Sequence, residues 1–98
     1  MTETQKLLAD YAENGSETAF REVVDRYVNL VYSTALRLVN GNTHLAEDVT
    51  QTVFISLARR GRNLSREVML GGWLHQHSYH VATKAVRAER RRQSRERG

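Results

Sequence analysis

Three histidines and one tryptophan stand just before a run of arginines, and these side chains are the best suited to chemistry. They lie in the segment 71–92, GGWLHQHSYHVATKAVRAERRR. His77 and His80 are three residues apart and could share one helical face, whereas His75 would point elsewhere, and no cysteine or carboxylate stands nearby at ligand spacing. Because a tetrahedral zinc site needs three or four protein ligands, we expect no metal site and no other cofactor.

Rings and cations gather on the side of this segment that would face outward from a helix. Cations bind phosphates and exposed bases stack on rings, so the combination favours contact with single-stranded nucleic acid. The simpler alternative is a solvated basic helix without a ligand. The residues of this face are Tyr79, His80, Thr83, Lys84, Arg87, Arg90 and Arg91.

Trp73 follows the glycine pair Gly71-Gly72 and has two interpretations. A tryptophan at the start of a helix is often packed into the core. Alternatively, it could act as a wedge, because inserted apolar side chains unstack duplex steps. The sequence leaves both interpretations open.

No arrangement typical of an enzyme is present. There is no nucleophile with an adjacent base and no glycine motif that would cradle a phosphate. The neighbouring carboxylates Glu47 and Asp48 would point about 100° apart on a helix, which is unsuitable for paired acid and base work. We therefore do not expect an enzyme.

Composition predicts a small helical domain with two different surfaces. The 98 residues include no cysteine and no proline, and no apolar run reaches the ~18 residues of a membrane helix. The start, MTETQKLLADY, does not resemble a signal peptide, so we expect a soluble, cytoplasmic protein. Residues 1–58 hold four Lys/Arg against eight Asp/Glu, whereas residues 59–98 hold eleven against three, and a polyanion is the expected partner of the second part.

Apolar periodicity predicts an all-α, compact four-helix domain. The expected helices are 3–13, 17–40, 44–59 and one from Trp73 into the arginines, with Ser16 and Thr43 as N-caps of the second and third. The fourth should bury Leu74, Ser78, Val81, Ala85 and Ala88, while residues 60–72 should form a loop. Residues 93–98 form a basic tail or the start of a linker and are expected to fray.

The third helix has an unusual outer face. Ala46, Val49, Val53 and Leu57 form the stripe that should face the core. Asp48, Gln51 and Ile55 fall on the opposite side, where an isoleucine among polar residues is unexpected. This group predicts a contact surface for another macromolecule.

Several sequence segments together resemble region 2 of the sigma-70 superfamily, specifically its extracytoplasmic-function (ECF) sigma factors. They are ETAFREVVDRYVNLVYSTALRLV, LAEDVTQTVFISL, and GWL followed by the basic helix that ends in VRAERRR. The combination of A-E-D-x-x-Q-x-x-F with a later Gly-Trp-Leu is the most specific part. The resemblance runs from about Leu7 to Arg92, so residues 1–92 are expected to be the domain.

The resemblance implies a function in transcription initiation for each exposed face. The third helix would dock on the clamp helices of the RNA polymerase β′ subunit. The loop and the fourth helix would bind the nontemplate strand of the promoter −10 element and help to melt the duplex. The polymerase-binding candidates are Asp48, Gln51, Ile55 and Phe54; the DNA-binding candidates are Asn63, Leu64, Ser65, Arg66, Trp73, Tyr79, His80, Lys84, Arg87 and Arg91.

Departures from the family pattern limit what can be transferred. Many relatives read W-L-x-R-I-A-x-N-x-A-x-D-x-x-R, and this chain keeps only Trp73, Leu74, Ala82 and Arg87 of that pattern. It replaces the arginine, the apolar pair, the asparagine and the aspartate by Gln76, His77 and Ser78, His80 and Lys84. A different −10 sequence is therefore expected. Such factors normally continue to a second helical domain for the −35 element, which this sequence does not supply, so we expect either an excised domain or an unusually short factor. Alone, it is expected to bind polymerase and single-stranded −10 DNA weakly, and duplex promoters hardly at all. An anti-sigma factor is a further candidate partner, and a basic helical module that binds nucleic acid without polymerase is the alternative.

Overall fold

Four helices make up the part of the chain that the computed structural model describes, residues 2–61 and 69–97. They are α1 (Glu3–Asn14), α2 (Glu17–Leu38), α3 (Thr43–Arg60) and α4 (Leu70–Arg97), and no strand occurs within these ranges. The prediction of an all-α, four-helix domain is confirmed.

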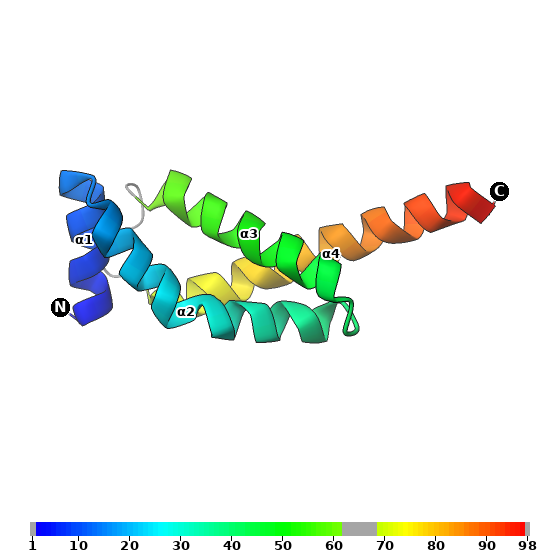
Figure 1. Cartoon of the computed structure of the whole chain (residues 1–98), viewed down its shortest axis with the longest axis horizontal. Coiled ribbons are helices and arrows are strands. Elements are labelled where there is room, and N and C mark those ends of the chain that lie inside the picture. The colour runs from blue at the N-terminus through cyan, green and yellow to red at the C-terminus, as the bar shows by residue number, and fades with distance from the viewer. Residues whose placement is uncertain (1, 62–68, 98) are drawn as a thin grey trace.

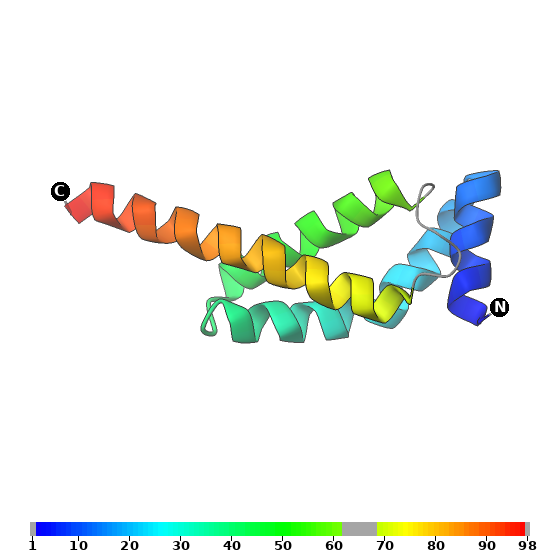
Figure 2. The same cartoon turned by 180° about the vertical axis from the view of Figure 1, so that it is seen from behind.

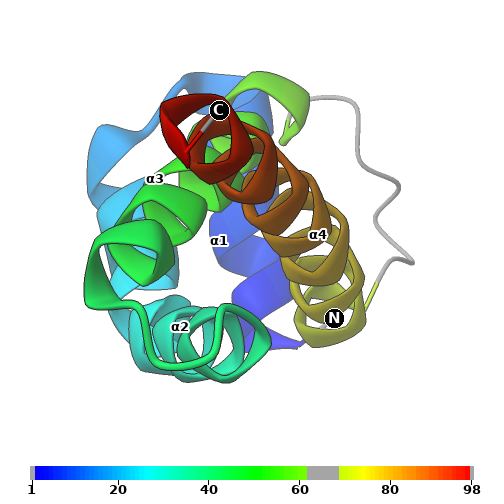
Figure 3. The same ribbon diagram turned by 90° about the vertical axis from the view of Figure 1, so that its right-hand side faces the viewer.

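The helices form a bundle from which one end of α4 projects. α2, α3 and α4 pack against one another, while α1 lies across the end of the bundle opposite the C-terminus (Figures 1 and 2). Figure 3 looks along the long axis and shows α2, α3 and α4 around a common centre. The structure measures 52 × 21 × 20 Å because the C-terminal part of α4 continues past the other helices.

Local capping explains where the first two helices begin and end. Thr2 and Gln5 form a capping box at the start of α1, and Gly15 ends that helix with a left-handed φ of 65°. The Ser16 hydroxyl then accepts a hydrogen bond from the Ala19 N–H at 3.1 Å. Each side-chain cap satisfies a backbone donor that the first helical turn leaves free. The prediction of Ser16 as N-cap is confirmed.

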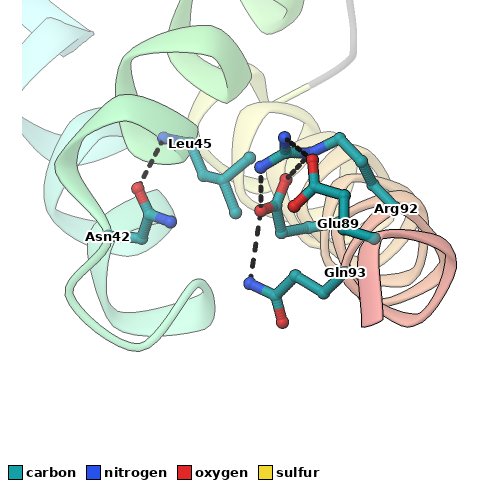
Figure 4. A network of polar contacts seen from close by, with 6 residues as sticks. Asn42, Leu45, Glu89, Arg92 and Gln93 are labelled. Atoms are coloured by element: carbon teal, nitrogen blue, oxygen red, sulfur yellow. Dashed lines mark hydrogen bonds and ion pairs between the residues drawn. The ribbon is translucent and has the colours of Figure 1, made fainter. Parts of the chain in front are cut away.

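The N-cap of α3 differs from the prediction. Asn42, not Thr43, holds this position, because its side-chain Oδ1 accepts a hydrogen bond from Leu45 N–H at 3.1 Å (Figure 4). Thr43 is the first residue of the helix. The preceding turn places Asn40 and Gly41 at φ values of 57° and 81°, which asparagine and glycine tolerate better than other residues.

The core lies where α2, α3 and α4 meet. The predicted stripe of α3 is confirmed, since Ala46, Val49, Val53 and Leu57 are all at most 1% exposed. On α4 the prediction is partly wrong: Ala82 is buried, whereas Ala88 is exposed, because α4 has begun to leave the bundle at that point. The largest fully buried side chains are Leu57, Leu74, Val23, Val31, Val49 and Val53.

α4 is longer at both ends than predicted. It begins at Leu70 instead of Trp73, because Leu70 is buried and anchors the first turn, so Gly71 and Gly72 lie within the helix. At the other end α4 continues to Arg97. Arg92 forms an ion pair with Glu89 at 2.6 Å (Figure 4). It forms another with Glu96 at 3.0 Å, so its partners lie about one turn away on either side. Such pairs support a helix that has no tertiary contacts.

α1 attaches to the bundle near the end of α3. The Tyr11 hydroxyl donates a hydrogen bond to the Ala58 carbonyl at 2.8 Å, and its ring packs on Phe20 with centroids 4.9 Å apart. Gly61 leaves room for this ring, since a Cβ there would lie 3.2 Å from Tyr11 and 2.8 Å from the Leu57 carbonyl oxygen. Arg26 of α2 also pairs with Glu3 of α1 at 2.8 Å.

Candidate nucleic-acid interface

The outer face of α3 carries the polar group that the sequence singled out. Asp48, Gln51 and Ile55 are exposed, and the Ile55 side chain retains 52% of its accessible surface. Their positions differ by three and four residues, so they lie next to one another on the helix surface. The stripe of Val49 and Val53 holds this face outward by burying the opposite side of the helix.

Phe54 does not belong to this exposed group, and its assignment to it is corrected. It is only 9% exposed and lies within the hydrophobic core cluster. The sequence interpretation failed because Phe54 directly precedes Ile55, and neighbouring residues on a helix point about 100° apart. Phe54 packs into the core and so helps to hold α3 in place.

The outer face of α4 is long and basic. Tyr79, His80, Lys84, Arg87 and Arg91 are all exposed, and the rings of Tyr79 and His80 lie edge to face with centroids 6.2 Å apart. Steps of three and four residues place the cations along one side of the helix. This face combines two rings with a row of positive charges.

Ion pairing separates the arginines of α4 into two groups. Arg92 is held by Glu89 and Glu96, whose hydrogen bonds and charges raise its pKa, while Arg92 in turn lowers the pKa of Glu89. Among the described residues, no carboxylate pairs with Lys84, Arg87, Arg90 or Arg91. These four cations, unlike Arg92, are therefore available to bind phosphates.

Trp73 combines features of both interpretations. It is half-buried and packs against the core cluster, yet it also lines a hollow at the protein surface. Its ring stacks on His77 with centroids 4.8 Å apart and an interplanar angle of 15°. Trp73 is thus held in a defined orientation by the core on one side and His77 on another.

The hollow beside Trp73 was not predicted from the sequence. It has a volume of about 200 Å³, and Arg60, Trp73, Gln76, His77 and His80 line it. Four of these residues follow the 73, 76, 77, 80 spacing of one helical face, so that pattern could have indicated their grouping. No sequence signal places Arg60 of α3 beside them, because this contact depends on how α3 and α4 pack.

His77 is electrostatically unusual among the residues of the hollow. Its pKa is lowered, first because burial removes water from the ring and then because the charges of Arg60, His80 and Lys84 oppose protonation. Its Nε2 is buried and has no hydrogen-bond partner among the residues that the structure describes. A neutral imidazole offers one donor and one acceptor, so His77 has an unused polar atom.

Four of the predicted DNA-binding residues lie outside the described residues. They belong to the segment 62–68 and are Asn63, Leu64, Ser65 and Arg66. The described ends of α3 and α4 bring Arg60 and Trp73 to the same hollow.

Within 2–61 and 69–97, no group of three or more His, Cys, Asp or Glu could hold a metal ion. In the same part of the chain, none of the helices has both the length and the apolar character needed to cross a bilayer.

Comparison with known proteins gives one match. A family model described as Sigma-70 region 2 matches residues 23–93, which include most of α2, all of α3 and most of α4. No curated protein and no solved structure matches the chain.

Proposed function

The chain belongs to the sigma-70 region 2 family, and on this premise we propose that α3 docks on RNA polymerase while α4 binds and helps to open promoter DNA. Domains of this family act within sigma factors, which direct RNA polymerase to promoters and are not enzymes. The proposal assigns the two exposed faces to these two partners.

One observation carries the proposal: the exposed faces of α3 and α4 have different chemistry. The α3 face has an exposed isoleucine beside a carboxylate and an amide. The α4 face has exposed rings and, in Lys84, Arg87 and Arg91, exposed cations that pair with no carboxylate of the described residues. A protein interface favours an apolar centre with polar surroundings, whereas a nucleic-acid strand favours cations and stacking platforms.

On α3, Asp48, Gln51 and Ile55 are the proposed polymerase contacts. The resemblance assigns Asp48 and Gln51 to the clamp helices of the β′ subunit, and the exposure of all three residues supports this role. Ile55 would lose its remaining water-accessible surface on docking, which is favourable. Phe54 would contribute by supporting the helix and not by direct contact.

On α4, Lys84, Arg87 and Arg91 are the proposed phosphate contacts, with Tyr79 and His80 as stacking surfaces for exposed bases. Trp73 would stabilise the edge of the opened region because the core already fixes its ring. Melting needs no chemical step, since contacts to the displaced strand and to extruded bases offset the lost stacking. Asn63, Leu64, Ser65 and Arg66 remain proposed contacts for an extruded base.

We extend the proposal to membership of the ECF group and to an anti-sigma partner that would cover the polymerase-binding face. The second candidate function is a nucleic-acid module that acts without polymerase. Lys84, Arg87, Arg90 and Arg91, which pair with no carboxylate of the described residues, favour both functions equally. The second function, however, gives Ile55 no role. The two functions therefore differ in what they predict for α3.

The double substitution Asp48→Ala/Gln51→Ala tests the docking surface. We expect at least about tenfold weaker binding to core polymerase, because interface residues that matter cost more than 1 kcal/mol when truncated. Pull-down titration or surface plasmon resonance with core enzyme would measure it. Asp25→Ala removes an exposed carboxylate from α2 and is the matched control. Unchanged polymerase binding by the double variant would contradict the assignment of α3.

A further inference from the structure

α1 has no contact with either partner in the proposed function. It covers Glu3–Asn14 and precedes the residues 23–93 that the family model matches. None of its residues is fully buried, although the helix lies across one end of the bundle (Figures 1 and 2). Its position therefore depends on a small number of side-chain contacts, and these contacts indicate what the helix does.

The C-terminal half of α1 contacts the last turn of α3. The Tyr11 hydroxyl donates a hydrogen bond to the Ala58 carbonyl at 2.8 Å, and the last four carbonyls of a helix have no partner within it. Gly61 follows directly after α3 and is buried. A Cβ on Gly61 would lie 3.2 Å from the Tyr11 ring. The ring therefore packs directly on the backbone at which α3 ends.

The N-terminal half of α1 lies beside the first turn of α4. Thr4 and Gln5 of α1 line a second hollow, of about 150 Å³, together with Leu70 and Gly71 of α4. Tyr27 of α2 lines the same hollow and links the two sides. Its hydroxyl forms a hydrogen bond with that of Thr4 at 3.3 Å, and its ring lies 4.0 Å from the position of a Cβ on Gly71. The start of α1 is thus connected to the start of α4.

The two contacts lie at opposite ends of one rigid element. Thr4 and Tyr11 are separated by about 10 Å along the helix axis, at 1.5 Å per residue. α1 therefore fixes how far the end of α3 stands from the start of α4. Arg60 and Trp73 of the candidate interface follow Ala58 and Gly71 by only two residues each. A movement of α1 would consequently change where both of these side chains lie.

We propose that α1 is a brace that positions the end of α3 against the start of α4, and that Tyr11 is a positioning residue for binding of the displaced strand. Tyr11 itself contacts no DNA. This inference rests on the proposed function, because it takes the start of α4 as part of the DNA interface. The proposed polymerase contacts Asp48 and Gln51 lie about two turns or more before Ala58, so docking on polymerase should not depend on the brace.

Loss of the Tyr11 contact should weaken DNA binding through the fraction of molecules in which the brace is in place. The apparent affinity of a protein for its ligand falls with the fraction that is competent to bind. Removal of the Tyr11 hydroxyl would leave the Ala58 carbonyl without its hydrogen bond, which favours displacement of the helix. Because α1 has no fully buried residue, few other contacts oppose this displacement.

Strand binding by the assembled complex tests the inference. Core polymerase with this domain would be titrated with a labelled nontemplate-strand oligonucleotide and followed by fluorescence anisotropy. We expect about threefold weaker binding for Tyr11→Phe, which loses one hydrogen bond, and at least about tenfold weaker binding for Tyr11→Ala, which also loses the packing of two rings. Tyr32→Phe is the matched control, because the half-buried Tyr32 has no hydrogen-bond partner for its hydroxyl among the described residues.

Two further readouts separate positioning from a general loss of folding. The affinity for core polymerase without DNA should stay at the wild-type value in both Tyr11 variants, whereas a poorly folded protein would lose both affinities. Trp73 is the single tryptophan of the chain, so quenching of its fluorescence by acrylamide reports on the start of α4. We expect Tyr11→Ala to increase this quenching, because the first turn of α4 becomes less fixed.

Gly61→Ala tests the same contact from the α3 side and leaves every side chain of α1 unchanged. The added Cβ would lie 3.2 Å from the Tyr11 ring and 2.8 Å from the Leu57 carbonyl oxygen. Either the ring or the end of α3 must therefore shift. We expect weaker strand binding with unchanged affinity for polymerase, and this result decides the question even if Tyr11→Ala does not fold.

The remaining outcomes distinguish the inference from the proposed function. Wild-type strand affinity in both Tyr11→Ala and Gly61→Ala would overturn the inference and leave the proposed function intact. An equal loss of polymerase and strand affinity would also overturn it, because Tyr11 would then support the fold as a whole. A wild-type complex that binds no nontemplate strand would contradict the proposed function itself.

Discussion

The exposed faces of α3 and α4 are built on the same core but differ in shape and charge. On α3, three neighbouring residues form a small surface around Ile55. On α4, exposed cations continue beyond the bundle to the projecting C-terminal part of the helix. A short surface with an apolar centre can bind with little dependence on salt, whereas a row of cations gains much of its affinity from released counterions.

This difference shows how a small helical domain can serve two partners at once. The buried sides of α3 and α4 meet in one cluster that includes Val53, Leu57 and Leu74, so both faces depend on the same packing. Their exposed sides do not share residues. Substitutions in the core should therefore remove both functions together, and substitutions on one face should remove one function.

The largest expected effect comes from breaking this shared core. Leu74 is fully buried, and Leu74→Ala should lower the free energy of unfolding by about 2–5 kcal/mol because it leaves a cavity. Urea denaturation would measure the loss, and binding to polymerase and to single-stranded DNA should weaken together. Leu30→Ala is the control, since Leu30 is 50% exposed and should change stability by less than about 0.5 kcal/mol. A stable Leu74→Ala protein would contradict the packing described.

A smaller and selective effect is expected on the α4 face. The triple variant Lys84→Ala/Arg87→Ala/Arg91→Ala should reduce the slope of log affinity against log salt by about 2 for single-stranded DNA, since each phosphate contact contributes about 0.7. Fluorescence anisotropy over a range of salt concentrations would measure this slope.

The matched control for the α4 face removes the same charge elsewhere. Lys6→Ala/Arg21→Ala/Arg37→Ala changes three exposed cations of α1 and α2. If the two triple variants showed the same slope, the affinity would depend on net charge and not on the α4 face.

The smallest expected effect is a pH dependence of folding stability that arises from His77 in the hollow. Burial and neighbouring cations lower the pKa of His77 in the folded protein, so the unfolded chain binds a proton more readily. Stability should therefore be lost as pH falls through about 6.5, the ordinary pKa of histidine. Urea denaturation would be measured between about pH 7.5 and about pH 5, on either side of the ordinary histidine pKa. Over this range the free energy of unfolding should fall less for His77→Gln than for wild type. An equal loss would assign the acid sensitivity to other groups.

The sequence predicted the elements with strong periodicity and missed those set by tertiary contacts. The α3 stripe was predictable because four apolar residues recur at one helical face. The start of α4 was not, because two glycines resemble a loop and only the burial of Leu70 shows why the helix begins there. Asn42 was missed as an N-cap because Thr43 beside it is also a common N-cap residue, although asparagine is the stronger one, and the structure places Asn42 at the cap.

In the candidate site, too, positions on one helical face were predictable from the sequence, whereas contacts between helices were not. The exposure of Asp48, Gln51 and Ile55 was predictable from their angular positions on the helix relative to the buried stripe. Phe54, by contrast, lies in the core cluster. The residues on α4 that line the hollow share a helical face, but Arg60 joins them across a helix–helix contact. Such a contact between separate elements cannot be read from the spacing of residues.

Separation of the two functions on one domain is tested most directly by measuring both affinities for two variants. Ile55→Ser should weaken binding to core polymerase and leave the affinity of the isolated domain for single-stranded DNA unchanged. The triple alanine variant of Lys84, Arg87 and Arg91 should do the reverse. If either variant lowered both affinities by the same factor while its helix content and stability stayed at wild-type levels, the assignment of α3 to polymerase and α4 to DNA would be contradicted.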